Sequence, residues 1–251
     1  MKITILGSGT CVPSLKRYPC AVLVQHKLHN ILIDAGPGII HQLLKFGVYI
    51  NDIDMILLSH FHLDHCADIA PFLFATKYSG VDREKKLTLA GGKGIRQLLK
   101  NLNKIYNHTI EMPEKVFEII ELDDEGGLEI SKAKLRLEFA RMKHTRESRG
   151  FRLIDGNGFV LVYSGDTDYT ETLVALARKA DVLICESSLP DEEKVSGHLT
   201  PSLAGRIAQK ANVKKIVLTH FYPECDHVDM KARCQKIFKG KIVLAQDLMR
   251  L

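Results

Sequence analysis

The sequence lacks long apolar runs, tryptophan and closely paired cysteines. No apolar stretch approaches the roughly 18 residues that a membrane-spanning helix needs. The N-terminal segment MKITILGSGT has too short an apolar stretch for a secretory signal and fits a first strand. None of the six cysteines forms a C-x-x-C pair, so a disulfide framework is not expected. We therefore expect a reduced, cytoplasmic protein with no membrane partner.

The chain also lacks linkers rich in proline or serine, internal repeats and low-complexity tracts. Hydrophobic residues make up 45% and charged residues 26% of the chain, which excludes disordered, collagen-like and coiled-coil proteins. The net charge of +5 is compatible with an anionic substrate without proving one. For 251 residues, one domain spanning residues 1–251 is the simplest expectation.

Short apolar segments bounded by Gly, Pro, Asn or Asp recur along the chain and predict β-strands. We expect them at residues 2–6, 21–25, 30–34, 54–59, 87–90, 134–139, 151–154, 159–163, 182–185, 216–219 and 242–245. Helical spacing of apolar residues predicts helices at 38–46, 170–180 and 201–211. So many strands do not suit a simple doubly wound sheet. They favour an α/β (α+β) protein in which two mixed sheets pack together with helices outside.

The histidines are concentrated where an apolar strand ends. Residues 60–65 read His-Phe-His-Leu-Asp-His. Because residues i and i+2 of an extended chain share a face, His60 and His62 can bind one ion, and the next turn brings Asp64 and His65 toward a second. Imidazole and carboxylate without thiolate favour Zn²⁺, with Mn²⁺ or Fe²⁺ as alternatives. Closed structural zinc sites usually contain cysteine, so this cluster indicates a catalytic site with an open position.

Three later polar residues also follow apolar segments, namely His144, Asp166 and His220. Each one alone is more simply explained as a core or surface residue. Sites built on sheets gather at strand ends, however, and the first cluster already requires further ligands. We therefore expect these three side chains to complete the metal site.

Together these motifs resemble the metallo-β-lactamase superfamily. HFHLDH is followed in order by His144, by Gly-Asp-Thr at 165–167 and by Thr-His at 219–220, so that the resemblance spans nearly the whole chain. It implies an αβ/βα four-layer sandwich with two metal ions between the sheets. It assigns the ligands of the first ion as His60, His62 and His144, and those of the second as Asp64, His65 and His220, with Asp166 bridging both.

Within that superfamily the sequence is most similar to the ribonuclease Z-like zinc phosphodiesterases. GSGTCVPSLKR followed by NILIDAGPG resembles the opening of that family. Gly197-His198-Leu199-Thr200 resembles its H-x-T motif, and Glu186 in CESS matches the carboxylate that partners this histidine. The resemblance implies hydrolysis of a phosphodiester by a hydroxide held between two zinc ions. His198 is then the general acid, Glu186 orients it, and Asp64 is also catalytic.

Asp34 and the basic residues around His144 can each be interpreted in two ways. Asp34 either orients a ligand histidine from outside the metal shell or is a turn residue at the end of a strand. The basic residues around His144 either contact substrate phosphates or form a solvated charged face, and the second interpretation is the simpler one. These residues are Arg141, Lys143, Arg146, Arg149 and Arg152.

The segment between His144 and Asp166 bears on the substrate. Full tRNA-processing members carry a protruding arm that in many of them is inserted here, whereas in this chain the two residues are only 22 positions apart and the segment is predicted to contain a hairpin at 151–163. The expected partner is therefore a phosphodiester such as an RNA 3′ end, a cyclic nucleotide or another small diester. The alternatives are another hydrolase on the same fold, acting on a lactone, thioester or β-lactam, and a non-catalytic metal-binding or RNA-binding protein. Relatives often form homodimers, but no segment marks an interface.

Overall fold

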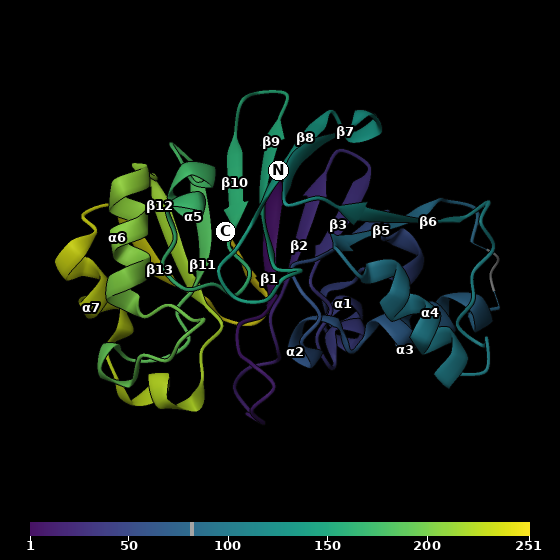
Figure 1. Ribbon diagram of the computed structural model, residues 1–251, viewed down its shortest axis with the longest axis horizontal. Helices are drawn as coiled ribbons and strands as arrows, with labels where there is room; N and C mark the ends of the chain where they lie inside the picture. Colours follow the sequence, from purple (N-terminus) through teal and green to yellow (C-terminus); the bar gives the residue numbers. More distant parts are fainter. Residues whose placement is uncertain (81–82) are drawn as a thin grey trace.

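Two mixed sheets form the centre of the fold in the computed structural model, which describes residues 1–80 and 83–251 (Figure 1). In spatial order the first sheet contains β14 (Met249–Arg250), β1 (Lys2–Gly7), β2 (Ala21–His26), β3 (His29–Ile33), β4 (Met55–Leu58), β5 (Leu87–Gly92) and β6 (Phe117–Leu122). The second contains β13 (Lys241–Leu244), β12 (Lys215–Thr219), β11 (Val182–Glu186), β10 (Val160–Tyr163), β9 (Arg149–Asp155), β8 (Leu135–Arg141) and β7 (Glu125–Ile130). In each sheet one half is antiparallel and the other parallel.

Helices lie on the outer side of each sheet, which gives the α/β sandwich expected from the sequence (Figure 1). Those of the first half are α1 (Ile39–Phe46), α2 (Leu63–Cys66), α3 (Ile69–Tyr78) and α4 (Ile95–Ile105). Those of the second half are α5 (Glu171–Leu176), α6 (Pro201–Ala211) and α7 (Met230–Ile237). Among the residues described, no helix combines the length and apolarity needed to cross a membrane.

The strands have apolar residues on both faces because both faces are covered. In β2, Val22 and Val24 pack in the core that joins the two sheets. The alternate residues Ala21 and Leu23 belong to a second core, which the first sheet forms with α1, α3 and α4. Strands buried on both faces read as continuous apolar runs, which is why they stand out in the sequence.

All eleven predicted strands are present, and β6, β7 and β14 are additional. The predicted hairpin is formed by β9 and β10, with Asp155 accepting hydrogen bonds from the backbone N–H groups of Asn157 (2.9 Å) and Phe159 (3.0 Å). The helix expected at 170–180 is too long, since α5 ends at Leu176. Lys179 has a φ of 55° and its N–H donates to the carbonyl of Ala211 at 2.8 Å, which excludes continued helical bonding.

Candidate metal centre

Polar residues that follow neighbouring strands meet at one edge of the sandwich. In the second sheet β10, β11 and β12 run parallel, and β8 has the same direction because β9 is antiparallel to both β8 and β10. The carboxyl ends of these four strands therefore share one edge, which brings together His144, Asp166, Glu186 and His220. The first sheet contributes residues 60–65, which follow β4.

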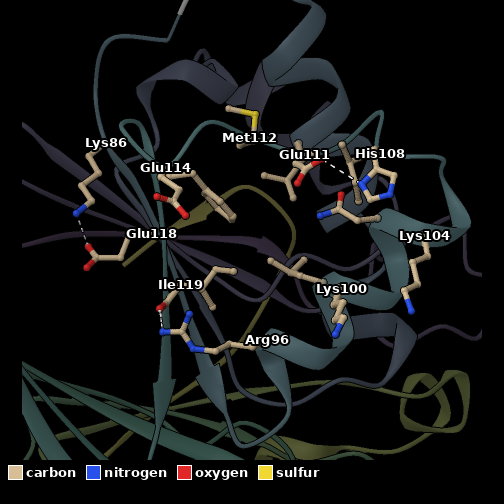
Figure 2. A pocket seen from close by; sticks show the side chains of 15 residues that line it. Lys86, Arg96, Lys100, Lys104, His108, Glu111, Met112, Glu114, Glu118 and Ile119 are labelled. Carbon is tan, nitrogen blue, oxygen red and sulfur yellow. Dashed lines mark hydrogen bonds and ion pairs between the residues drawn. The ribbon is translucent and has the colours of Figure 1, made fainter.

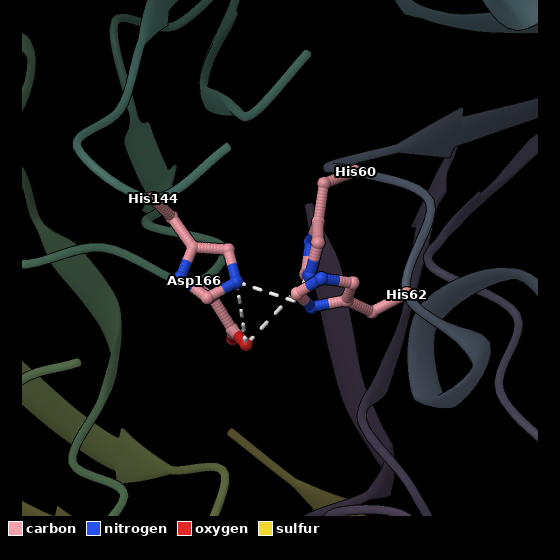
Figure 3. A group of neighbouring side chains, drawn as sticks. All are labelled: His60, His62, His144 and Asp166. Carbon is pink, nitrogen blue, oxygen red and sulfur yellow. Dashed lines mark hydrogen bonds and ion pairs between the residues drawn. The ribbon is translucent and has the colours of Figure 1, made fainter. Parts of the chain in front are cut away.

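One group of donors consists of His60, His62, His144 and Asp166, whose ligand atoms all lie within 4.8 Å of one another (Figure 3). Nε2 of His144 is 3.1 Å from Nδ1 of His62. Oδ2 of Asp166 lies 3.8 Å from Nε2 of His60 and 4.0 Å from Nε2 of His144. His60 is buried whereas His62 is exposed, so this group opens to solvent on one side.

A second group consists of Asp64, His65 and His220. The Nε2 atoms of His65 and His220 are 3.2 Å apart, and Oδ2 of Asp64 is 3.3 Å from Nε2 of His220. Asp166 reaches this group too, since Oδ1 is 3.4 Å from Nε2 of His65 and Oδ2 is 3.4 Å from Nε2 of His220. One carboxylate thus contacts both groups.

The spacing of these nitrogens fits a divalent cation. Two imidazole nitrogens about 2.1 Å from a tetrahedral zinc ion lie about 3.4 Å apart, close to the separations of both histidine pairs. Nε2 of His60 is buried and has no hydrogen-bond partner among the described residues. An unpartnered buried nitrogen is costly unless an ion binds it. Imidazole and carboxylate donors suit zinc, manganese and iron alike.

Asp34 lies behind the second group and holds His65 in place. Nδ1 of His65 donates to Oδ2 of Asp34 at 2.8 Å, which leaves Nε2 free to act as a ligand. Tyr163 donates to the same oxygen at 2.6 Å. Burial, and then the charge of Asp34, raises the pKa of Tyr163, so the phenol remains a donor. Asp34 directly follows β3 and also binds the histidine, so the two interpretations of this residue are compatible.

His144 is oriented by a backbone carbonyl. Its Nδ1 donates to the carbonyl of Gly197 at 2.9 Å, so that Nε2 faces the donor group. Gly197 has a φ of 87°, and an added Cβ would lie 3.0 Å from Nδ1 of His144. Both facts favour glycine at this position. Asp168 holds the turn by accepting from the N–H of Gly197 at 3.2 Å.

Glu186 and His198 lie beside the donor groups and are joined by Ser188, a residue that the sequence analysis missed. Nδ1 of His198 is 3.2 Å from Oε1 of Glu186. Ser188 donates to Oε2 of Glu186 at 2.6 Å, and its Oγ is also 2.8 Å from Nδ1 of His220. Burial alone would lower the pKa of His198, but the hydrogen bond and charge of Glu186 raise it. The sequence hinted at Ser188 only through its place in CESS. In an extended chain, a residue two positions after Glu186 points to the same side as Glu186.

The basic residues around His144 divide into two kinds. Arg149 is fully buried and donates to the carbonyls of Asp123 (2.7 Å) and Arg146 (3.1 Å). Arg152 donates to the carbonyl of Leu176 at 2.8 Å. These two arginines therefore stabilise the fold and are not free to contact a substrate. Lys143 and Arg146, by contrast, are exposed.

A cavity of about 620 Å³ lies elsewhere, between α4 and β6 (Figure 2). No residue of the two donor groups lines it. Its Lys86 pairs with Glu118 at 2.8 Å, and its His108 pairs with Glu111 at 3.1 Å. The volume of a cavity therefore does not by itself identify the candidate active site of this protein.

Comparison with known proteins agrees with this geometry. Residues 29–221, which include both donor groups, match the family described as the β-lactamase superfamily domain. The probable metallo-hydrolase YhfI of Bacillus subtilis is 26% identical over 98% of each chain. A ribonuclease Z of Methanocaldococcus jannaschii is 29% identical, with 99% of this chain and 96% of the relative covered.

Solved structures show the same fold. The crystal structure of YhfI from Bacillus subtilis, a metallo-β-lactamase fold protein, superposes with a TM-score of 0.86 at 24% identity, covering 100% of this chain and 98% of that one. The short form of human tRNase Z superposes with a TM-score of 0.80 at 24% identity, with the same coverage.

Proposed function

The chain is a metallo-hydrolase of the β-lactamase superfamily, and we propose that it hydrolyses phosphodiesters with two bound divalent ions, zinc in the first instance. The observation that carries this proposal is the position of Asp166, whose carboxylate contacts both donor groups at once. A carboxylate shared in this way is suited to bridging two ions.

In this proposal the two groups bind separate ions. His60, His62 and His144 hold the first ion, and Asp64, His65 and His220 hold the second, with Asp166 shared. Asp34 and the carbonyl of Gly197 orient His65 and His144 through the ring nitrogens that do not face the ions. Such outer contacts fix the tautomer and the ring orientation of the ligands.

Two divalent ions in these positions would supply Lewis acidity, which stabilises the charge that develops on a phosphoryl group attacked by water. Asp64 and Asp166 supply only two negative charges against the four positive charges of such a pair, so the loaded site attracts an anionic ester. The exposed side next to His62 admits the substrate.

His198 is the group that protonates the leaving oxygen. Its Nδ1 faces Glu186 and Ser188, so Nε2 is the nitrogen that can present a proton to the substrate. Glu186 is held in turn by the N–H of Thr167 at 2.8 Å and by Ser188 at 2.6 Å. A carboxylate fixed in this way orients the imidazole and stabilises its protonated form.

The substrate is proposed to be a small phosphodiester or an RNA 3′ end. Three similar proteins bear the name ribonuclease Z, which supports a phosphodiester. Between Met142 and Asp166 the chain forms one tight loop followed by the β9–β10 hairpin, and β9 and β10 are both strands of the second sheet. This segment therefore lies within the sandwich and does not project as an arm that could grip a folded RNA.

The test combines metal analysis with a substrate panel. Metal content per chain is measured by mass spectrometry, and hydrolysis is measured on bis(p-nitrophenyl) phosphate, a 3′-extended precursor tRNA, a lactone, a thioester and a β-lactam. Near two ions per chain with diester hydrolysis supports the proposal. Turnover of the lactone, thioester or β-lactam alone, or bound metal without any turnover, contradicts it. Cleavage of the precursor tRNA at its 3′ end would show that an arm is dispensable.

A further inference from the structure

A smaller cavity, of about 350 Å³, adjoins the first donor group. It is lined by Arg141, Lys143, His144, Arg146 and Asp168, together with Gly197 and three neighbouring residues. His144 belongs both to this lining and to the donor group. Whatever fills the cavity therefore contacts a residue of the first donor group.

The cavity carries positive charge that the protein does not balance. Arg141 lies 3.7 Å from Asp124. The side chains of Lys143 and Arg146 are exposed, and within the described part of the chain neither forms an ion pair or a hydrogen bond. The one carboxylate of the lining, Asp168, is already engaged by the ammonium group of Lys194 at 3.1 Å.

The backbone under these two cations is fixed. The N–H of Lys143 donates to Oγ1 of Thr167 at 3.1 Å, and its carbonyl accepts from the N–H of Asp168 at 2.8 Å. The carbonyl of Arg146 accepts from the buried guanidinium of Arg149 at 3.1 Å. Only the two side chains must be ordered when an anion binds, which keeps the entropic cost of binding small.

The cavity between α4 and β6 also contains lysines, but three glutamates share its lining. Lys86 pairs with Glu118 and His108 with Glu111, while Lys100 and Lys104 form no ion pair among the described residues (Figure 2). In the cavity beside His144 the carboxylate of the lining is already paired, so the guanidinium of Arg146 and the ammonium of Lys143 are both uncompensated. A planar guanidinium matches the oxygens of a phosphate, and an ammonium adds a point charge.

We propose that the cavity beside His144 is a second phosphate site, in which Lys143 and Arg146 bind a phosphate of the substrate next to the one that is hydrolysed. This inference rests on the proposed phosphodiesterase function and narrows it. The preferred substrates then carry a second phosphate, one nucleoside away from the diester that is hydrolysed, as an oligonucleotide does. Diesters with a single phosphate are poorer substrates.

The test compares two mononucleotides that differ by one phosphate. Binding of adenosine 3′,5′-bisphosphate and of AMP to the metal-loaded protein is measured by calorimetry. The unaltered protein should bind the bisphosphate at least about 10-fold more tightly, since one hydrogen bond to a charged group contributes at least about this factor. The double variant Lys143→Ala/Arg146→Ala should lose this preference, whereas Lys143→Arg should keep it.

A matched control removes two cations elsewhere. Lys100→Ala/Lys104→Ala makes the same change in net charge on α4 and should leave the preference intact. The binding constant for the bisphosphate should also depend on salt concentration. A plot of its logarithm against the logarithm of the salt concentration should become less steep in the Lys143→Ala/Arg146→Ala variant and stay unchanged in the control.

The outcomes separate this inference from the proposed function, because calorimetry needs no turnover. Equal affinity for the two nucleotides, or an equal loss of preference in the control, overturns the second phosphate site. Hydrolysis of bis(p-nitrophenyl) phosphate without a preference for the bisphosphate overturns the site alone. A preference that depends on Lys143 and Arg146 in a protein that hydrolyses no diester supports the site and overturns the function.

Discussion

Asp34→Asn tests whether the residues behind the metal ligands control metal binding. The Asp34 carboxylate is fully buried and accepts from the N–H (2.7 Å) and Oγ (2.8 Å) of Ser59, from Nδ1 of His65 (2.8 Å) and from the hydroxyl of Tyr163 (2.6 Å). Asp34 also has a φ of 61°, which asparagine tolerates. The substitution therefore changes charge and hydrogen bonding with little change in shape.

The expected magnitude follows from these four contacts. An amide NH₂ replaces one carboxylate oxygen, so at least one buried donor of Ser59, His65 or Tyr163 loses its acceptor. One unsatisfied buried donor costs about 1–3 kcal/mol, and bonds to a charge are stronger than bonds to an amide. We expect the free energy of unfolding of the metal-free protein to fall by about 3 kcal/mol. Metal affinity should fall by about 10- to 100-fold because His65 loses its carboxylate partner.

Competition with a chromogenic chelator measures the metal affinity, and urea unfolding measures the stability. Asp155→Asn is the matched control, because Asp155 is also buried and accepts backbone hydrogen bonds from Asn157 and Phe159, but it lies in the β9–β10 turn. It should lower stability without lowering metal affinity. The reasoning is refuted if Asp34→Asn leaves metal affinity within about twofold, or if Asp155→Asn lowers it equally.

Three further substitutions test the site and the packing around it. Asp64→Ala should abolish diester hydrolysis and reduce the metal content, since it removes a carboxylate from the second donor group; full metal content by mass spectrometry would contradict this. His198→Ala should abolish hydrolysis while the metal content stays unchanged, because its proposed role is proton donation; normal activity of the purified variant would remove it from the mechanism. Gly92→Ala should lower the free energy of unfolding by about 2 kcal/mol. Its Cβ would lie only 2.1 Å from the carbonyl oxygen of Glu147. Gly156→Ala, whose Cβ meets no atom closer than 4.0 Å, is the control in the same urea experiment.

Much of the architecture could be predicted because the signals are local. Strands buried on both faces read as apolar runs, and the eleven predicted strands are all present. The missed strands lack this pattern. β7 contains EGGLEI and is largely exposed at a sheet edge, and β14 has only two residues. Helices α2, α3, α4 and α7 were not predicted either. In α4 the apolar residues Ile95, Leu99 and Leu102 have helical spacing, so the sequence did contain its signal.

The sequence also determined which residues were candidates for the metal centre. His60, His62, Asp64 and His65 are adjacent in the chain, and His144, Asp166 and His220 each follow an apolar strand. The chain alone could not show how these segments meet. The shared direction of β8, β10, β11 and β12 decides that the later residues reach one edge.

Only the tertiary structure decided which of several similar residues is buried, which is exposed, and which partner each one contacts. Arg149 and Lys143 look alike in a basic run, yet one is buried against backbone carbonyls and the other faces a cavity with its charge unbalanced. Ser188 is one serine among many until the fold places it between Glu186 and His220. Burial and the identity of distant partners determine charge balance and hydrogen bonding, and neither is encoded in local spacing.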